Sequence, residues 1–80
     1  MNKKVIVYSA PWCPWCHKAM DFLKANKIEF QEKDVEKDSK YVEELQKWSG
    51  QTGIPVIVIE DKDVIVGFDQ AKLKMLLNIK

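Results

Sequence analysis

Hydrophobic positions along the chain follow two kinds of spacing, and each kind predicts one type of element. Short runs that are rich in β-branched residues, or that alternate apolar with polar residues, predict strands. These runs are Val5–Tyr8, Ile28–Gln31, Val56–Ile59 and Val64–Val66. Apolar side chains three and four residues apart predict helices. The helices begin after Cys13, after Asp38 or Ser39, and after Asp69.

The order of these elements predicts one mixed sheet. A strand–helix–strand unit comes first, followed by a helix, a strand hairpin and a last helix. The first unit implies a parallel pair of strands, and the hairpin adds an antiparallel pair to the same sheet. We therefore expect an α/β fold with a four-stranded sheet and helices on both faces. Trp48 has the spacing of a core residue on the second helix, whereas the densely charged Glu32–Lys40 predicts a solvated loop and helix start.

The composition is that of one globular domain spanning residues 1–80. Hydrophobic residues make up 46% and charged residues 31%, so the composition is not that of a disordered chain. The net charge is +1, from 13 lysines against 12 acidic residues, which does not suggest a nucleic-acid-binding face. The apolar run Val5–Tyr8 is too short for a secretory signal, and no segment has the length of a membrane span. We expect a cytoplasmic protein that binds neither nucleic acid nor membrane.

Both cysteines lie in one string, Ser9–His17, which reads SAPWCPWCH. Thiol–disulfide exchange, metal binding and covalent haem attachment all use such strings. A structural zinc site wants four ligands, and beyond Cys13, Cys16 and His17 the chain has no second cysteine pair and no other histidine. Haem attachment to Cys-x-x-Cys-His normally requires export, and the predicted sheet has no obvious haem cavity. Cys-x-x-Cys on a strand-to-helix turn of a cytosolic chain favours thiol–disulfide exchange without a bound metal.

The predicted helix gives the two cysteines different tasks. Cys13 falls at the helix N-cap, where the N–H groups of Trp15 and Cys16 and the helix dipole favour its thiolate, the nucleophilic form. Cys16 lies one turn deeper on the same face and can resolve a mixed disulfide formed on Cys13. Because this turn would present Cys13 to solvent, we expect Trp12, Trp15 or both to form an exposed apolar rim that contacts a partner. We expect His17 to be an exposed residue of the first turn.

Three motifs in this order carry a family likeness. The string Cys13–Cys16 resembles the Cys-Pro-Tyr-Cys site of dithiol glutaredoxins, with Trp in place of Tyr. Ser49–Pro55 resembles the segment of that family that ends in Thr-Val-Pro, and Val66–Asp69 lies where the family has Gly-Gly-x-Asp. The likeness covers nearly the whole chain. It implies a thioredoxin-like βαβαββα fold of the glutaredoxin branch.

The resemblance also implies a binding site and an activity. It implies that Pro55 has a cis peptide bond and that the backbone of Ile54 pairs with an extended substrate next to the cysteines. Phe68 and Asp69 would bind the carboxylate and ammonium groups of glutathione, beside Trp15 at the dithiol. The expected activity is thiol–disulfide exchange on protein or glutathione mixed disulfides. We expect a monomer with no bound cofactor and with glutathione as co-substrate.

Two departures from the family pattern leave the electron donor open. Glutaredoxins commonly have Lys or Arg where this chain has Ala10, and Val66 replaces the first glycine, as in redoxins that serve ribonucleotide reductase. One alternative is therefore a dedicated hydrogen donor that a flavoprotein of the thioredoxin-reductase type recharges. Another is a carrier in which two chains share an iron–sulfur cluster through Cys13.

Overall fold

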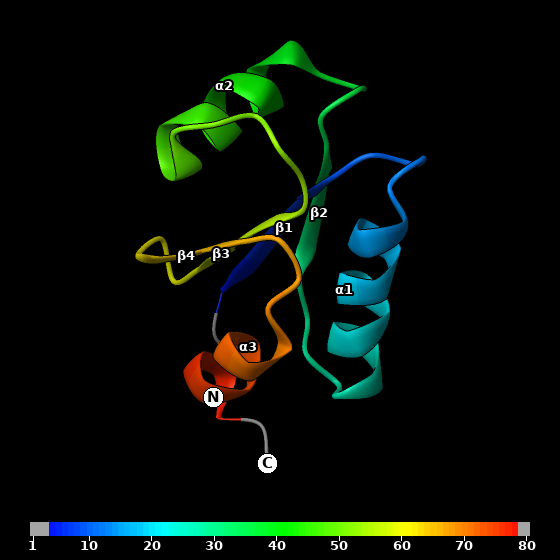
Figure 1. The fold of residues 1–80 in the computed structure, drawn as a ribbon, viewed down its shortest axis with the longest axis vertical. Coiled ribbons are helices and arrows are strands. Elements are labelled where there is room, and N and C mark those ends of the chain that lie inside the picture. Colours follow the sequence, from blue (N-terminus) through cyan, green and yellow to red (C-terminus); the bar gives the residue numbers. More distant parts are fainter. Residues whose placement is uncertain (1–3, 79–80) are drawn as a thin grey trace.

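The computed structural model describes residues 4–78, and it has the predicted strand and helix order (Figure 1). The strands are β1 Val5–Ser9, β2 Gln31–Asp34, β3 Val56–Ile59 and β4 Asp63–Val66. The helices are α1 Pro14–Ala25, α2 Ser39–Ser49 and α3 Gln70–Leu77. The predicted domain spans residues 1–80, whose first three and last two residues lie outside the described range. None of the helices in that range is long and apolar enough to cross a membrane.

The strands form a mixed sheet in the order β2-β1-β3-β4. β1 and β2 are parallel, as the strand–helix–strand unit requires, and β3 is antiparallel to both β1 and β4. β1 and β3 occupy the centre of the sheet, and every residue of both strands is buried. This is why their sequences are almost continuously apolar.

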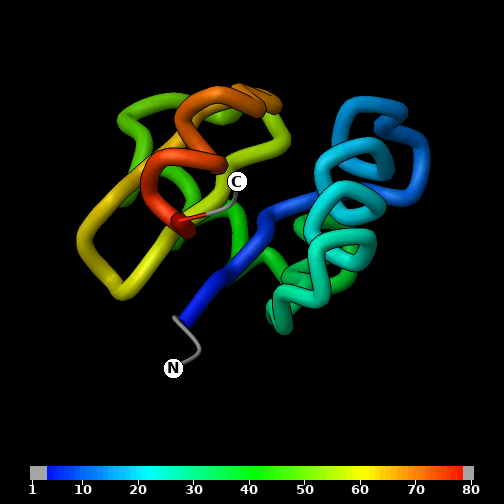
Figure 2. The backbone as a smooth tube through the Cα atoms, turned by 90° about the horizontal axis from the view of Figure 1, so that it is seen from below, coloured from blue at the N-terminus to red at the C-terminus, as the bar shows by residue number. Residues whose placement is uncertain are grey.

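Helices cover both faces of the sheet, as predicted. On one face, Val5 and Val7 of β1 pack with α1 and with Leu73 of α3. On the other face, Ile6 and Tyr8 pack with α2. Figure 2 shows β1 (blue) passing between α1 (cyan) and the C-terminal hairpin and helix (yellow to red). We call the two sides the α1 face and the α2 face.

The second strand is present as predicted, but its predicted bounds Ile28–Gln31 are wrong because it spans Gln31–Asp34. The loop predicted at the start of Glu32–Lys40 is therefore wrong as well. The N–H of Ile28 bonds to Leu23 O at 2.9 Å, which ties this segment to the end of α1. Ile28 and Phe30 instead pack from the connecting segment against the core of the α1 face. Strand pairing begins only at Gln31, which lies opposite Ile6. β2 is a charged edge strand, a common device against edge-to-edge association.

The helix boundaries agree with the predicted caps. Asp38 Oδ1 accepts the N–H of Lys40 at 2.9 Å, and α2 ends at Gly50, whose φ of 71° suits glycine. Asp69 Oδ1 accepts the N–H of Lys72 at 3.1 Å at the start of α3. Trp48 packs against the core of the α2 face, as predicted.

Candidate active site

The turn between β1 and α1 places the two cysteines one helical turn apart. Cys13 is the N-cap of α1 and has extended backbone angles, with φ −93° and ψ 106°. Cys13 Sγ accepts the N–H of Cys16 at 3.2 Å, and the backbone N–H of Cys13 donates to Ala10 O at 3.1 Å. Pro14 is the first helical residue, where its missing N–H costs no hydrogen bond. Both cysteines are free thiols.

Two details of the predicted environment of Cys13 are wrong. The side chain was expected to face solvent, but its exposure is only 4%. Of the two expected N–H donors to Sγ, Cys16 makes the bond and Trp15 does not. Both differences have one cause: Sγ turns back over the first turn of α1 and joins the buried cluster of that helix. The sulfur still lies at the N-terminus of α1 and accepts the Cys16 N–H.

Cys16 is the more deeply buried of the two cysteines. It is fully buried on the inner side of α1. Burial, followed by the interaction with Cys13, raises the pKa of Cys16 to about 12, against the partly opposing hydrogen bond from the Ala10 backbone. Near neutral pH Cys16 is therefore a thiol. The pair therefore consists of one sulfur at the N-cap of α1 and one buried thiol that must lose its proton before it can attack.

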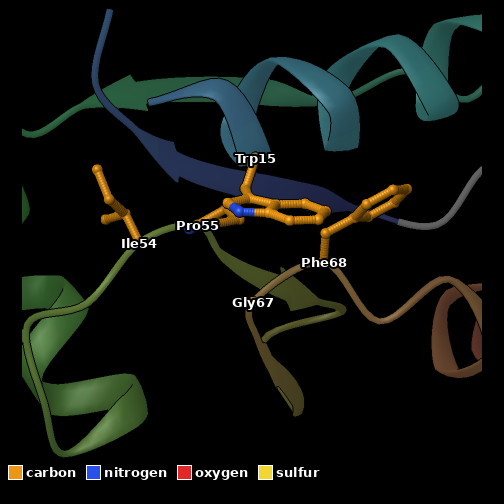
Figure 3. Close-up of a pocket in the computed structure, with 5 residues that line it drawn as sticks. All are labelled: Trp15, Ile54, Pro55, Gly67 and Phe68. Carbon is orange, nitrogen blue, oxygen red and sulfur yellow. The ribbon is translucent and has the colours of Figure 1, made fainter. Parts of the chain in front are cut away.

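A groove of about 300 Å³ begins at the N-terminus of α1. It is lined by Trp15, Ile54, Pro55, Gly67 and Phe68, so three segments far apart in the sequence meet there (Figure 3). In Figure 3 the indole of Trp15 extends from Pro55 toward Phe68. The Ile54–Pro55 peptide bond is cis, as the resemblance implied. Ile54 also packs against the buried cluster that contains both cysteines.

The structure brings most of the predicted binding residues together. Phe68 lines the groove and packs edge-on against Phe22, with 5.7 Å between the ring centroids. Asp69 is not among the lining residues; it is the exposed N-cap of α3 directly after Phe68. Gly67 was missed as a site residue, although it stands in the quoted Val66–Asp69 motif. Its φ of 83° and its N–H bond to Pro55 O at 2.8 Å hold this side of the groove.

Two exposed tryptophans flank the dithiol, as predicted. Trp12 is 67% exposed and Trp15 57% exposed. The indole N–H of Trp12 donates to the Glu36 carboxylate, and Lys18 Nζ lies 4.5 Å from the centre of the Trp15 ring. These contacts orient both rings at the surface. His17 is exposed as expected, with Nε2 at 2.8 Å from Pro11 O.

The fold and the dithiol geometry agree with a known family. The family model for glutaredoxin matches residues 5–64. The chain therefore belongs to the glutaredoxin family, as the three sequence motifs indicated.

Individual relatives give the same result. A glutaredoxin-like protein of 8.6 kDa from the rubredoxin operon of Clostridium pasteurianum is 44% identical over 71 residues, which are 89% of this chain and 93% of that protein. Glutaredoxin 3 of Escherichia coli K12 is 33% identical over 60 residues, covering 75% of this chain and 72% of that protein. The crystal structure of a glutaredoxin from Archaeoglobus fulgidus superposes with a TM-score of 0.84 at 29% identity, covering 92% of this chain and 85% of that one.

Proposed function

We propose that the protein is a dithiol disulfide oxidoreductase that reduces disulfides in proteins and mixed disulfides with glutathione. One observation carries the proposal. Cys13 is the N-cap of α1, its sulfur accepts the Cys16 N–H, and the adjoining groove is open to a substrate. We further propose that it works as a cytoplasmic monomer and needs no bound cofactor.

The reaction proceeds in two exchange steps. The Cys13 thiolate attacks one sulfur of the substrate disulfide, forming a mixed disulfide and releasing the first substrate thiolate. The Cys16 sulfur, once deprotonated, attacks Cys13 Sγ. The Cys13–Cys16 bond forms, the bond between Cys13 and the substrate breaks, and the second substrate sulfur leaves reduced. Two electrons pass from the dithiol to the substrate, and a donor must then reduce the new disulfide.

The groove supports an extended peptide-like substrate. Its lining side chains are apolar apart from the indole N–H of Trp15, and the backbone at Ile54 can pair with an added strand. The start of α3 at Phe68 and Asp69 offers N–H groups to a carboxylate, and the Asp69 carboxylate can meet an ammonium group. These contacts would suit glutathione, which has both groups.

A second candidate differs only in the electron donor: a flavoprotein of the thioredoxin-reductase type, not glutathione. The uncharged groove favours it, because no lysine is among the lining residues to bind a glutathione carboxylate. Ala10, at the position where the family commonly has a cation, is only 1% exposed, so its side chain belongs to the core. A protein donor would rely on apolar contact with Trp12 and Trp15 instead of on ion pairs.

A coupled assay separates the two candidates. Oxidised protein is offered either glutathione with glutathione reductase, or thioredoxin reductase alone, and NADPH oxidation is followed with a disulfide substrate. The first candidate requires NADPH oxidation in the glutathione arm, and the second requires it only in the flavoprotein arm. Absence of oxidation in both arms, with folded protein, contradicts the proposed function. The cluster-carrier alternative predicts a brown protein on isolation, whereas we expect a colourless one.

A further inference from the structure

Trp15 is the aromatic side chain that α1 contributes to the groove beside the dithiol. Figure 3 shows its indole extending from Pro55 toward Phe68. The side chain is 57% exposed, so much of its surface is free for a further contact. Lys18 Nζ lies 4.5 Å from the ring centre, and Lys18 is not among the residues that line the groove. The ring is therefore held from outside the groove, and its groove side remains available to a substrate.

A second aromatic ring, that of Phe68, lines the same groove. Phe68 packs edge-on against Phe22, with 5.7 Å between the ring centroids and 63° between the ring planes. It also packs against the buried cluster that contains both cysteines. Pro55, another lining residue, is fully buried. Phe68 and Pro55 thus form a fixed apolar part of the groove, toward which the Trp15 indole extends.

Gly67 leaves the groove open where another residue would place a side chain. Its φ of 83° lies in the left-handed region that favours glycine, and its N–H donates to Pro55 O at 2.8 Å. Apart from its chain neighbours, no described residue has an atom within 4 Å of the place that a Cβ would occupy. A substrate side chain can therefore enter the groove beside Gly67 without displacing protein atoms.

Charged groups lie near the groove but not in its lining. None of the lining residues is charged, and the indole N–H of Trp15 is their polar side-chain group. Asp69 follows Phe68 but accepts the N–H of Lys72 as the cap of α3, and Lys18 lies over the Trp15 ring. Burying a charged group in this lining would cost free energy, whereas burying an apolar side chain would gain it.

We propose that the groove takes an aromatic side chain next to the reacting cysteine of a protein substrate, and that Trp15 selects for it. The inference rests on the proposed function, which places the substrate disulfide at Cys13. Trp15 is two residues after Cys13, and Ile54, whose backbone would pair with the substrate, lines the same groove. A substrate ring can pack edge-on or offset against the indole and Phe68. The preferred substrates are then protein disulfides with an aromatic neighbour, ahead of the charged glutathione.

Disulfide-linked dimers of short peptides test this preference. Each peptide has one cysteine, an acetylated N-terminus and an amidated C-terminus, so it is uncharged. One peptide has Phe directly before the cysteine, a second has Phe directly after it, and a third has Ala at both positions. Reduced protein is mixed with excess dimer, the reaction is stopped with acid, and the free peptide is measured by chromatography. In each turnover Cys13 attack releases one peptide thiol, Cys16 attack on Cys13 releases the second, and the protein dithiol is oxidised to the disulfide.

The readout is the ratio of the second-order rate constants for the better Phe peptide and the Ala peptide. Damage to Cys13 itself would slow both peptides alike and leave this ratio unchanged. We expect a ratio of about ten in the parent, the size of one favourable aromatic contact. Trp15→Ala should bring the ratio close to one, and Trp15→Phe, which keeps a ring, should give an intermediate value. The control Met75→Ala removes an apolar side chain of α3 that is 68% exposed and outside the groove lining, so it should keep the parent ratio.

Three results would overturn the proposal: a parent ratio near one, an unchanged ratio in Trp15→Ala, or an equal loss of the ratio in Met75→Ala. A higher rate constant with glutathione disulfide than with either Phe peptide would also overturn it, because the uncharged lining would then not set the preference. All four outcomes leave the exchange reaction intact. Failure of the reduced parent to release thiol from any of these disulfides would instead contradict the proposed function, so the two failures are distinguishable.

Discussion

The two faces of the sheet contain a similar polar arrangement, a hydroxyl that donates to a glutamate, but with a different charge balance. On the α1 face, Ser9 donates to Glu32; on the α2 face, the neighbouring residue Tyr8 donates to Glu44 at 2.9 Å. Glu44 also accepts from Lys33 Nζ at 2.6 Å, and this ion pair neutralises its charge. Among the residues that the structure describes, no lysine pairs with Glu32.

The cluster around Glu44 is structural. The Lys33 ammonium lies over the Tyr8 and Tyr41 rings, at 5.8 and 5.4 Å from their centroids, so the cluster ties β1, β2 and α2 together. Burial and then the Glu44 carboxylate raise the pKa of Tyr8, so its hydroxyl remains a donor. On the α1 face, the buried cluster contains both cysteines. We infer that the α2 face supports the fold and the α1 face carries the chemistry.

The largest effect should come from the cysteines. Cys13→Ser should abolish every exchange reaction, because it removes the attacking sulfur. Cys16→Ser should accumulate mixed disulfides on Cys13 and retain activity on glutathionylated substrates, since free glutathione can resolve them. Steady-state assays of both variants test this. Equal and complete loss in a folded Cys16→Ser protein would show that the route through Cys13 alone does not operate.

On the α2 face, Tyr8→Phe should reduce stability without reducing activity. The variant removes a buried hydrogen bond to a charged group, a loss of about 1.5 kcal/mol in the free energy of unfolding. Urea unfolding measures this loss, and the dithiol assay serves as the functional control. A stable but inactive Tyr8→Phe protein would contradict the division between the two faces.

Asp69, which follows the groove residue Phe68, can be tested for two roles with two variants. Asp69→Ala removes the N-cap of α3 and should lower the free energy of unfolding by about 1 kcal/mol. Asp69→Asn keeps a capping oxygen and should lower it little. If the carboxylate also contacts glutathione, both variants should raise the KM for glutathione substrates. An unchanged KM in both would leave Asp69 with the capping role alone.

The smallest effect should be the dependence of stability on acid. The hydrogen bond from Lys33 is the main cause that lowers the pKa of Glu44. A carboxyl with a lower pKa in the folded state stabilises the fold above its unfolded pKa, and this contribution is lost as pH falls through the folded pKa. Stability should therefore decline below about pH 4.3, the usual glutamate range. Glu44→Gln should show a shallower decline in thermal unfolding scans, and an identical pH profile would contradict this.

Most of the fold could be predicted from the sequence because its central strands are buried on both faces. The bounds of β2 could not be predicted, because as an edge strand it contributes mostly backbone pairing, and its residues Gln31–Asp34 are polar. The N-cap position of Cys13 followed from Pro14 and the helical spacing. The burial of Cys13 and the Ser9–Glu32 hydrogen bond could not be predicted from the sequence, because both depend on how distant segments pack. Gly67 could have been found from the motif that contains it.

Alkylation of the reduced protein with iodoacetamide near neutral pH, followed by peptide mapping, most directly tests the central claim that the two cysteines have different roles. Cys13 is the N-cap of α1, and its sulfur accepts the Cys16 N–H, whereas Cys16 is a buried thiol with a pKa of about 12. We predict a single modification at Cys13, with Cys16 reacting only after unfolding. Modification of Cys16 first, or of both at equal rates, would contradict the assignment of Cys13 as the attacking sulfur.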